Sequence, residues 1–278
     1  MIKKSSSTPI RVWLRDAAEM LANAGISSAL LDAEIILAHT LRKSRTWLHA
    51  HDDEALTPRE REIAGARLDL RLDRTPIAYI IGHKEFYGRR FAVAPSVLIP
   101  RPESEVLIEL LANLCNGSSQ TLIDVGTGSG CLGITAKLEH PELEVTLVDI
   151  SRHALTIAEK NAELLNADVN CIKNDLLAPN PQLPPHADII IANLPYVDRE
   201  WERSPETNYE PALALFADKK GLALIERLIQ EAASYLEPRG HLLLEADPEQ
   251  HTAIIHHAAT LGYQHILTRD YAVVLRYS

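Results

Sequence analysis

Hydrophobic and polar positions follow two different patterns along the chain. Between residues 12 and 81, apolar residues recur three or four positions apart, as at Leu14, Ala18 and Leu21, and this spacing predicts helices only. From about residue 105 onward, short apolar runs alternate with helical patterns. Strands that alternate with helices indicate βαβ units, so we expect a mostly parallel, doubly wound sheet in the second part of the chain.

Seven short apolar runs in the second part predict the strands of this sheet. They are residues 121–125, 145–148, 170–172, 188–192, 240–245, 263–267 and 272–276. Helical patterns, for example residues 154–165 and 222–235, lie between the earlier runs. Little sequence separates the last two runs, so we expect them to form a closing hairpin with one antiparallel strand.

A different kind of sequence connects the two parts. Residues 85–88 and 91–93 predict a short β-hairpin. Pro100 and Pro102 then flank Arg101, and two prolines so placed hold the backbone extended and stiff. We therefore expect a helical domain at residues 1–82, a hairpin and linker at 83–104, and an α/β domain at 105–278.

One predicted helix in the first domain carries both a start signal and a row of arginines. Thr57 can cap the helix, Pro58 tolerates the first position, and Glu60 can close a capping box. Five arginines recur after Thr57, and two interpretations remain open for them: a solvated face, or a docking surface for an RNA-bearing or acidic partner. They are Arg59, Arg61, Arg67, Arg71 and Arg74.

Composition narrows the class of protein. The 278 residues are 46% hydrophobic and 24% charged, which is typical of a folded globular chain rather than a disordered one. The net charge of -10 argues against broad nucleic-acid binding, because a phosphate backbone attracts a basic surface. Cys115, Cys131 and Cys171 stand far apart, so we expect neither a disulfide scaffold nor a metal site.

The start of the chain and its apolar runs indicate where the protein works. The first residues, MIKKSSSTPIRVW, carry charge but no apolar segment of the kind that a secretory leader contains. No apolar run reaches the roughly 18 residues that a membrane span needs. We therefore expect a cytoplasmic protein that does not enter a membrane.

A glycine-rich loop follows the first predicted strand of the α/β domain. Gly126, Gly128 and Gly130 occupy alternate positions, which lets the backbone turn tightly and approach a ligand closely. A helix then begins, with its N–H groups directed into the site. The second strand ends at Asp149, 19 residues after Gly130, where an acid can accept hydrogen bonds from both hydroxyls of a ribose. Together these features predict a nucleotide-binding site.

The spacing of the loop favours one class of cofactor. Dinucleotide-binding loops read GxGxxG, whereas this loop reads GxGxG and is preceded by Asp124. An acid at this place repels a pyrophosphate but suits the cationic amino-acid tail of S-adenosylmethionine, which carries an ammonium and a sulfonium. We therefore favour S-adenosylmethionine over NAD.

The fourth predicted strand leads directly into a tetrapeptide, Asn193-Leu194-Pro195-Tyr196. In a doubly wound sheet, ligands bind beyond the carboxyl ends of the strands, which places Asn193 beside the cofactor loop. The Asn193 side-chain oxygen and a neighbouring backbone carbonyl can accept hydrogen bonds from a planar NH2 group and orient it for in-line attack on a methyl group. Pro195 biases Leu194 to an extended backbone, and Tyr196 offers a face for packing on the planar group.

These motifs together resemble the PrmC/HemK family of protein-glutamine methyltransferases, and the resemblance covers nearly the whole chain. It rests on the helical N-terminal part and on PIAYIIGHKEFYGRRFAVAPSVLIPRPESE, DVGTGSGCLGI, LVDIS, IIIANLPYV and YEPALALFADKKGL. The linker that ends in IPRPE is its most specific part. The resemblance implies a class I S-adenosylmethionine-dependent methyltransferase sheet of Rossmann-like form, with a small all-helical N-terminal domain that helps to dock the substrate.

The family's activity and site residues follow as expectations from this resemblance. Family members methylate the Gln of the Gly-Gly-Gln motif in peptide-chain release factors, using S-adenosylmethionine and no metal. Asn193, Pro195 and Tyr196 are then catalytic, and Leu194 joins them in binding the glutamine amide. The expected cofactor residues are Gly126, Thr127, Gly128, Ser129, Gly130, Asp149, Ile150, Asp175, Leu176 and Asn193. We expect a monomer that has release factors, and not nucleic acid, as its partners.

Three positions depart from the family pattern. Leu194 replaces the usual proline, and NLPY also resembles the motif of ribosomal-RNA adenine dimethylases. Ala246 and Asp247 follow the LLLE strand where a glycine is usual, and residues 269–271 form a very short last connection. The first departure keeps open an adenine amino-group methyltransferase acting on RNA or DNA. A nucleotide-binding module without catalysis and an NAD oxidoreductase are the remaining alternatives.

Overall fold

The computed structural model describes residues 8–115 and 117–278. The interpretation that the chain starts without an apolar leader rests largely on residues 1–7, which lie outside the described residues. Within the described residues, no helix is both long enough and apolar enough to cross a membrane. The chain folds as two compact units: one runs to Gly82 and includes Ser204–Tyr209, and the other contains His83–Arg203 and Glu210–Ser278.

Within its described residues, the first unit contains five α-helices and one apolar core. Ile10, Leu21, Ala33, Leu37 and Leu48 are among the fully buried residues of that core. The predicted start of the fourth helix is confirmed, because the Thr57 hydroxyl accepts from the Glu60 N–H at 3.2 Å and the Glu60 carboxylate accepts from the Thr57 N–H at 2.8 Å. The helices are α1 (Ile10–Asn23), α2 (Ala29–Leu41), α3 (Arg45–Ala50), α4 (Pro58–Leu72) and α5 (Ile77–Ile81).

The expectation of helices only is wrong for one segment of this unit. Residues Ala55–Leu56 (β2) form a two-residue strand that pairs antiparallel with Thr8–Pro9 (β1). The Ile10 N–H also donates to the Glu54 carbonyl at 2.9 Å. Pairing between positions so far apart in the chain leaves no signature in a local apolar pattern, so helical spacing could not reveal it.

The arginine row of α4 is not one solvated face. Arg59 is exposed, whereas Arg71 is only 5% exposed and its Nε donates to the buried Asp32 carboxylate of α2 at 2.7 Å. Arg61 and Arg67 are half-buried and donate to threonine hydroxyls elsewhere in the unit. Arg61, Arg67 and Arg71 therefore hold the helices together, so a solvated face does not describe the whole row, and the docking interpretation stays a prediction.

The segment Ser204–Tyr209 joins this unit through charged groups, although the sequence places it in the α/β domain. The Glu206 carboxylate accepts from both Nη atoms of Arg71 at 3.1 Å and from Arg74 at 3.3 Å. The Tyr209 hydroxyl donates to the Asp73 carboxylate at 2.9 Å. A segment that follows the fourth strand of the sheet is thus part of the helical unit.

The second unit contains a seven-stranded, mostly parallel sheet in the order β10-β11-β9-β8-β5-β6-β7. β10 and β11 form the predicted closing hairpin, and β11 is antiparallel to both of its neighbours. Chain order reverses at β5, which lies between β8 and β6, so a crevice is expected at the carboxyl ends of these strands. The strands are β5 (Thr121–Val125), β6 (Glu144–Asp149), β7 (Asn170–Lys173), β8 (Ala187–Ala192), β9 (Leu236–Glu245), β10 (Tyr263–Arg269) and β11 (Ala272–Tyr277).

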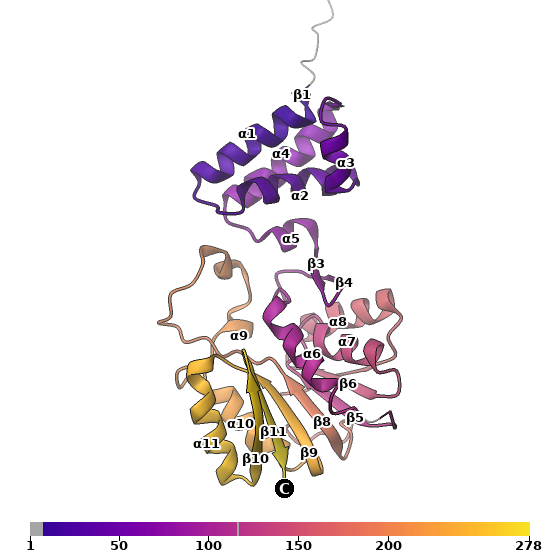
Figure 1. Ribbon diagram of the computed structural model, residues 1–278, viewed down its shortest axis with the longest axis vertical. Helices are drawn as coiled ribbons and strands as arrows, with labels where there is room; N and C mark the ends of the chain where they lie inside the picture. Colours follow the sequence, from indigo (N-terminus) through magenta and orange to yellow (C-terminus); the bar gives the residue numbers. More distant parts are fainter. Residues whose placement is uncertain (1–7, 116) are drawn as a thin grey trace, which may run out of the picture. The chain divides into compact units, whose positions relative to one another are not determined.

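Helices cover both faces of this sheet, as Figure 1 shows. Apolar side chains of α6, α7 and α8 pack on one face and those of α10 and α11 on the other, which gives two buried cores. The predicted hairpin is present as β3 (His83–Phe86) and β4 (Arg89–Ala92). The doubly wound α/β architecture is therefore confirmed. The helices are α6 (Glu105–Leu111), α7 (Cys131–Glu139), α8 (Arg152–Leu165), α9 (Ala212–Leu215), α10 (Ala223–Ala232) and α11 (His251–Thr260).

Candidate functional site

The loop after β5 has the backbone that only glycine adopts easily. Gly126, Gly128 and Gly130 have φ values of +75°, +56° and +83°. At Gly126 a Cβ atom would also lie 2.7 Å from the Leu194 side chain, and at Gly130 it would lie 2.6 Å from the Ile134 side chain. Conformation and close packing therefore both require glycine at the first and third positions of the loop.

Asp149, the last residue of β6, is locked against this loop. One carboxylate oxygen accepts from the Gly128 N–H at 2.9 Å, and the other accepts from the Ser151 N–H at 2.8 Å. Burial raises the pKa of Asp149, and these backbone hydrogen bonds oppose the rise because they favour the charged form. The carboxylate is thus fixed in one orientation at the edge of the sheet.

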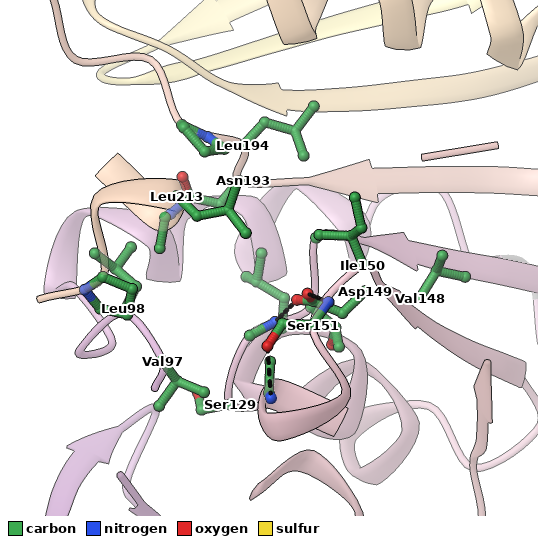
Figure 2. Close-up of a pocket in the computed structure, with 18 of the residues that line it drawn as sticks. Val97, Leu98, Ser129, Val148, Asp149, Ile150, Ser151, Asn193, Leu194 and Leu213 are labelled. Atoms are coloured by element: carbon green, nitrogen blue, oxygen red, sulfur yellow. Dashed lines mark hydrogen bonds between the residues drawn. The ribbon is translucent and has the colours of Figure 1, made fainter. Parts of the chain in front are cut away.

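A cavity lies at the carboxyl ends of β5, β6 and β8 and brings the predicted motifs together. In Figure 2, Asp149, Ile150 and Ser151 lie on one side of it, and Val97 and Leu98 lie on the other. Eleven of the predicted site residues line the cavity, whereas Gly130 and Tyr196 do not. They are Gly126, Thr127, Gly128, Ser129, Asp149, Ile150, Asp175, Leu176, Asn193, Leu194 and Pro195.

The tetrapeptide reaches the cavity with its first three residues. Asn193 lines the cavity, and its Nδ2 donates to the Ser104 hydroxyl at 3.0 Å, so the amide oxygen is the end left for a ligand. The Leu194 side chain is only 4% exposed and packs over Gly126 in the apolar core. The residue that departs from the family pattern therefore fills space beneath the loop.

Tyr196 lies away from this lining. It is half-buried, and its hydroxyl donates to the Glu245 carboxylate at the end of β9 at 3.2 Å. Burial, together with Glu245, raises the pKa of Tyr196, so the phenol stays protonated and acts as a donor. Its expected packing on a planar ligand group stays a prediction.

The electrostatic character of the site is acidic. Asp124 is 1% exposed, accepts from the Thr127 hydroxyl at 2.6 Å and from the Gly133 N–H at 2.9 Å, and burial raises its pKa to about 6. Arg101 lines the cavity, but its guanidinium pairs with the buried Glu210 at 2.5 Å. Such a site favours a cationic ligand group over a phosphate. Among the described residues, no group of three acidic, histidine or cysteine side chains is arranged to hold a metal ion.

Several lining residues carry no signal in the sequence pattern. Ser96, Val97 and Leu98 enter from the linker, and Leu213 enters from α9. Only folding places these segments beside the strand ends. Glu245 does not line the cavity, but the sequence does carry a signal for it. Like Asp149, it is an acid that ends a run of apolar strand residues.

Comparison with known families matches both units. Residues 12–82 match the family described as the PrmC N-terminal domain, and residues 102–207 match the methyltransferase small domain. A methyltransferase structure from Pyrococcus furiosus is 19% identical, covers 76% of this chain and 96% of its own, and has a TM-score of 0.53. That likeness supports the fold assigned to the second unit.

Curated relatives extend over most of the chain. A release factor glutamine methyltransferase from Koribacter versatilis is 38% identical over 244 residues, covering 84% of this chain and 86% of its own. The protein of the same name from Deinococcus radiodurans is 35% identical over 259 residues, covering 92% of both chains. These matches span the helical unit, the linker and the sheet.

Proposed function

The chain belongs to the release factor glutamine methyltransferase family, and on that premise we propose how its cavity carries out the reaction. The protein is an S-adenosylmethionine-dependent methyltransferase that acts on the side-chain amide of a glutamine in a release factor. One observation carries the proposal: the glycine loop and the tetrapeptide after β8 line the same cavity. A cofactor and a planar amide can therefore meet there.

The residues of the cavity fit S-adenosylmethionine. The positive-φ glycines leave room for close approach of a ligand to the backbone, and the fixed Asp149 carboxylate can accept from two ribose hydroxyls. Asp124 and Asp149 make the site favourable for a positive charge. We propose that residues 126–130, 149, 150, 175 and 176 hold the cofactor, which when bound supplies a methyl group activated by its sulfonium.

We propose that residues 193–196 hold the substrate amide. With its NH2 group turned toward Ser104, Asn193 offers Oδ1 to an N–H of the incoming glutamine. The Leu194 backbone carbonyl can accept the second N–H, and the change from proline to leucine leaves that carbonyl in place. Two acceptors would hold the amide nitrogen in line with the methyl group that the bound cofactor would supply.

The apolar rim of the cavity supports a peptide substrate. Leu213 is 62% exposed, and Leu98 lines the same cavity from the linker. We propose that this rim receives the Gly-Gly-Gln segment, because residues without side chains allow the backbone to lie close to it. We further propose that the helical unit helps to dock the release factor.

The adenine amino-group alternative is not favoured, because the relatives that match most of the chain are named for a protein substrate. The net charge of -10 also supports a protein partner over nucleic acid. We propose that the protein acts as a monomer. Light scattering of the purified protein tests this. Because release factors act in translation, we propose the cytoplasm as its site of action.

Methyl transfer from labelled S-adenosylmethionine to unmodified release factor tests the substrate assignment. The control acceptor carries Gln→Ala in its Gly-Gly-Gln motif, and total RNA is assayed in parallel. We expect label on the wild-type acceptor alone. Label on the Gln→Ala acceptor or on RNA contradicts the assignment.

A further inference from the structure

A buried carboxyl behind the tetrapeptide has no role in the reaction as described so far. Glu245 ends β9 and is 1% exposed. Its Oε1 accepts from the Tyr196 hydroxyl at 3.2 Å, and its Oε2 is buried without a hydrogen-bond partner. No ion pair within the described residues involves Glu245. An uncompensated buried carboxyl costs stability, so its presence beside a functional site calls for a reason.

The groups around Glu245 connect it to Asn193. The Asn193 Nδ2 donates to the Ser104 hydroxyl at 3.0 Å, and the neighbouring side chains of Ser104, Tyr196 and Asn193 all favour the charged form of Glu245. An ionised carboxylate only accepts hydrogen bonds, whereas an amide has one donor end and one acceptor end. The donor end of the Asn193 amide is therefore attracted toward Ser104 and Glu245, and the acceptor end is left for the cavity.

We infer that Glu245 is a positioning residue that, through Ser104, holds the Asn193 amide with its NH2 group inward and its oxygen toward the substrate. This inference rests on the proposed function, in which the Asn193 oxygen receives the glutamine N–H. The flipped amide would present its NH2 group to the NH2 of the substrate. Two donors cannot bond to each other, so the flipped form does not bind the substrate productively.

The protonation state of Glu245 then sets the fraction of correctly oriented amide. Burial raises the pKa of Glu245 to about 7, and the charge of Glu103 on the linker adds to the rise. The other groups facing it are Ser104, Asn193 and Tyr196, and the Cys131 thiol of α7 interacts with its charge. Below pH 7 the carboxyl gains a proton, becomes a donor and no longer favours the inward NH2 group.

Glu245→Gln tests the inference, with Glu237→Gln as a matched control. Glu237 lies on the same strand at its other end, with a side chain that is 47% exposed and 3.9 Å from His186. We expect Glu245→Gln to lower kcat about 10- to 100-fold, the scale of a misplaced catalytic group, with cofactor affinity unchanged. The wild-type rate should fall as the pH drops below 7, and the variant should lack this limb. Glu237→Gln should match the wild type in kcat and in the fall of the rate below pH 7.

Nuclear magnetic resonance gives a readout that does not depend on turnover. In ¹⁵N-labelled protein, the Asn193 side-chain NH2 signals, assigned by their loss in Asn193→Asp, should shift with a midpoint near pH 7. They should not shift in Glu245→Gln. Wild-type kcat with an unchanged pH limb in Glu245→Gln, or NH2 signals insensitive to pH, would overturn the inference. If the wild type fails to methylate release factor, the proposed substrate is wrong, while the NH2 titration still decides the role of Glu245.

Discussion

Two buried acids of the helical unit pair with arginines, whereas two buried acids near the cavity, Asp124 and Glu245, have no cation partner. On α2, Asp32 and Glu34 are each 3% exposed, and each pairs with an arginine: Asp32 with Arg71 at 2.7 Å and Glu34 with Arg45 at 2.5 Å. Asp124 and Glu245 are each 1% exposed but have no such partner. Burial raises the pKa of Asp124 to about 6 and the pKa of Glu245 to about 7. Paired acids hold helices together, whereas unpaired ones mark the place where the fold retains polar groups for chemistry.

The pairing of buried acids in the helical unit can be tested by removing Arg71. Arg71→Met leaves Asp32 and Glu206 without their shared cation, so we expect a loss of about 3–5 kcal/mol in the free energy of unfolding. Urea denaturation measures the loss. Arg59→Met, at an exposed position of the same helix, should change stability by less than about 0.5 kcal/mol. Equal stability of the two variants would contradict the structural role of Arg71.

Removing an unpaired acid should have the opposite effect on stability. The pKa of Glu245 rises from the ordinary 4.5 to about 7 in the folded chain. Between these two pH values the unfolded chain releases the proton and the folded chain keeps it. The stabilising contribution of the protonated Glu245 is therefore fully present below pH 4.5. As the pH rises to 7, the free energy of unfolding falls by about 3 kcal/mol. Glu245→Gln avoids this loss, so its Tm relative to the wild type should rise between pH 5 and pH 8. A constant difference in Tm across this range would contradict the raised pKa.

Two aspartates beside the cavity sharpen the comparison further. Asp149 is held by backbone N–H groups and has no cation partner, whereas both carboxylate oxygens of Asp175 bind Arg227 at 3.0 Å. We expect Asp149→Asn to weaken S-adenosylmethionine binding about 10- to 100-fold, the value of one or two hydrogen bonds to a charged group. Asp175 also lines the cavity, but Arg227 already occupies its carboxylate, so we expect Asp175→Asn to weaken binding less, by about threefold. Calorimetric titration measures both, and the reverse order would contradict the site assignment.

The smallest expected effect concerns the cap of α4. Thr57→Ala removes the hydroxyl that accepts from the Glu60 N–H, so we expect a loss of about 1 kcal/mol in unfolding free energy. Thr57→Ser retains a hydroxyl and should restore most of it. Thermal unfolding of the two variants measures the difference. Identical values for alanine and serine would show that the capping box does not stabilise the helical unit.

The sequence predicted those features that depend on neighbouring positions along the chain. The seven strands, the positive-φ glycines and the capping box at Thr57 all follow from local spacing or from turn chemistry. The burial of Arg71 could not be predicted in this way, because its partners Asp32 and Glu206 are 39 and 135 positions away.

The same limit applies at the site. Asp149 could be found because an acid ends the second strand after a glycine loop. Glu245 carries a similar signal, but its link to Asn193 and Ser104 depends on three segments that only the sheet brings together. Tyr196 is the last residue of the tetrapeptide, yet its hydroxyl is directed to Glu245 and its side chain does not line the cavity.

Asn193 provides the most direct test of the central claim, that the tetrapeptide orients the substrate amide while the glycine loop holds the cofactor. The measurement is kcat for release factor together with the S-adenosylmethionine Kd, for the wild type and Asn193→Ala. We predict a fall in kcat of at least about 100-fold, as for removal of a group that acts in the transition state, with the Kd within about threefold of the wild type, a change of less than about 0.7 kcal/mol. A near wild-type kcat in Asn193→Ala would contradict the account.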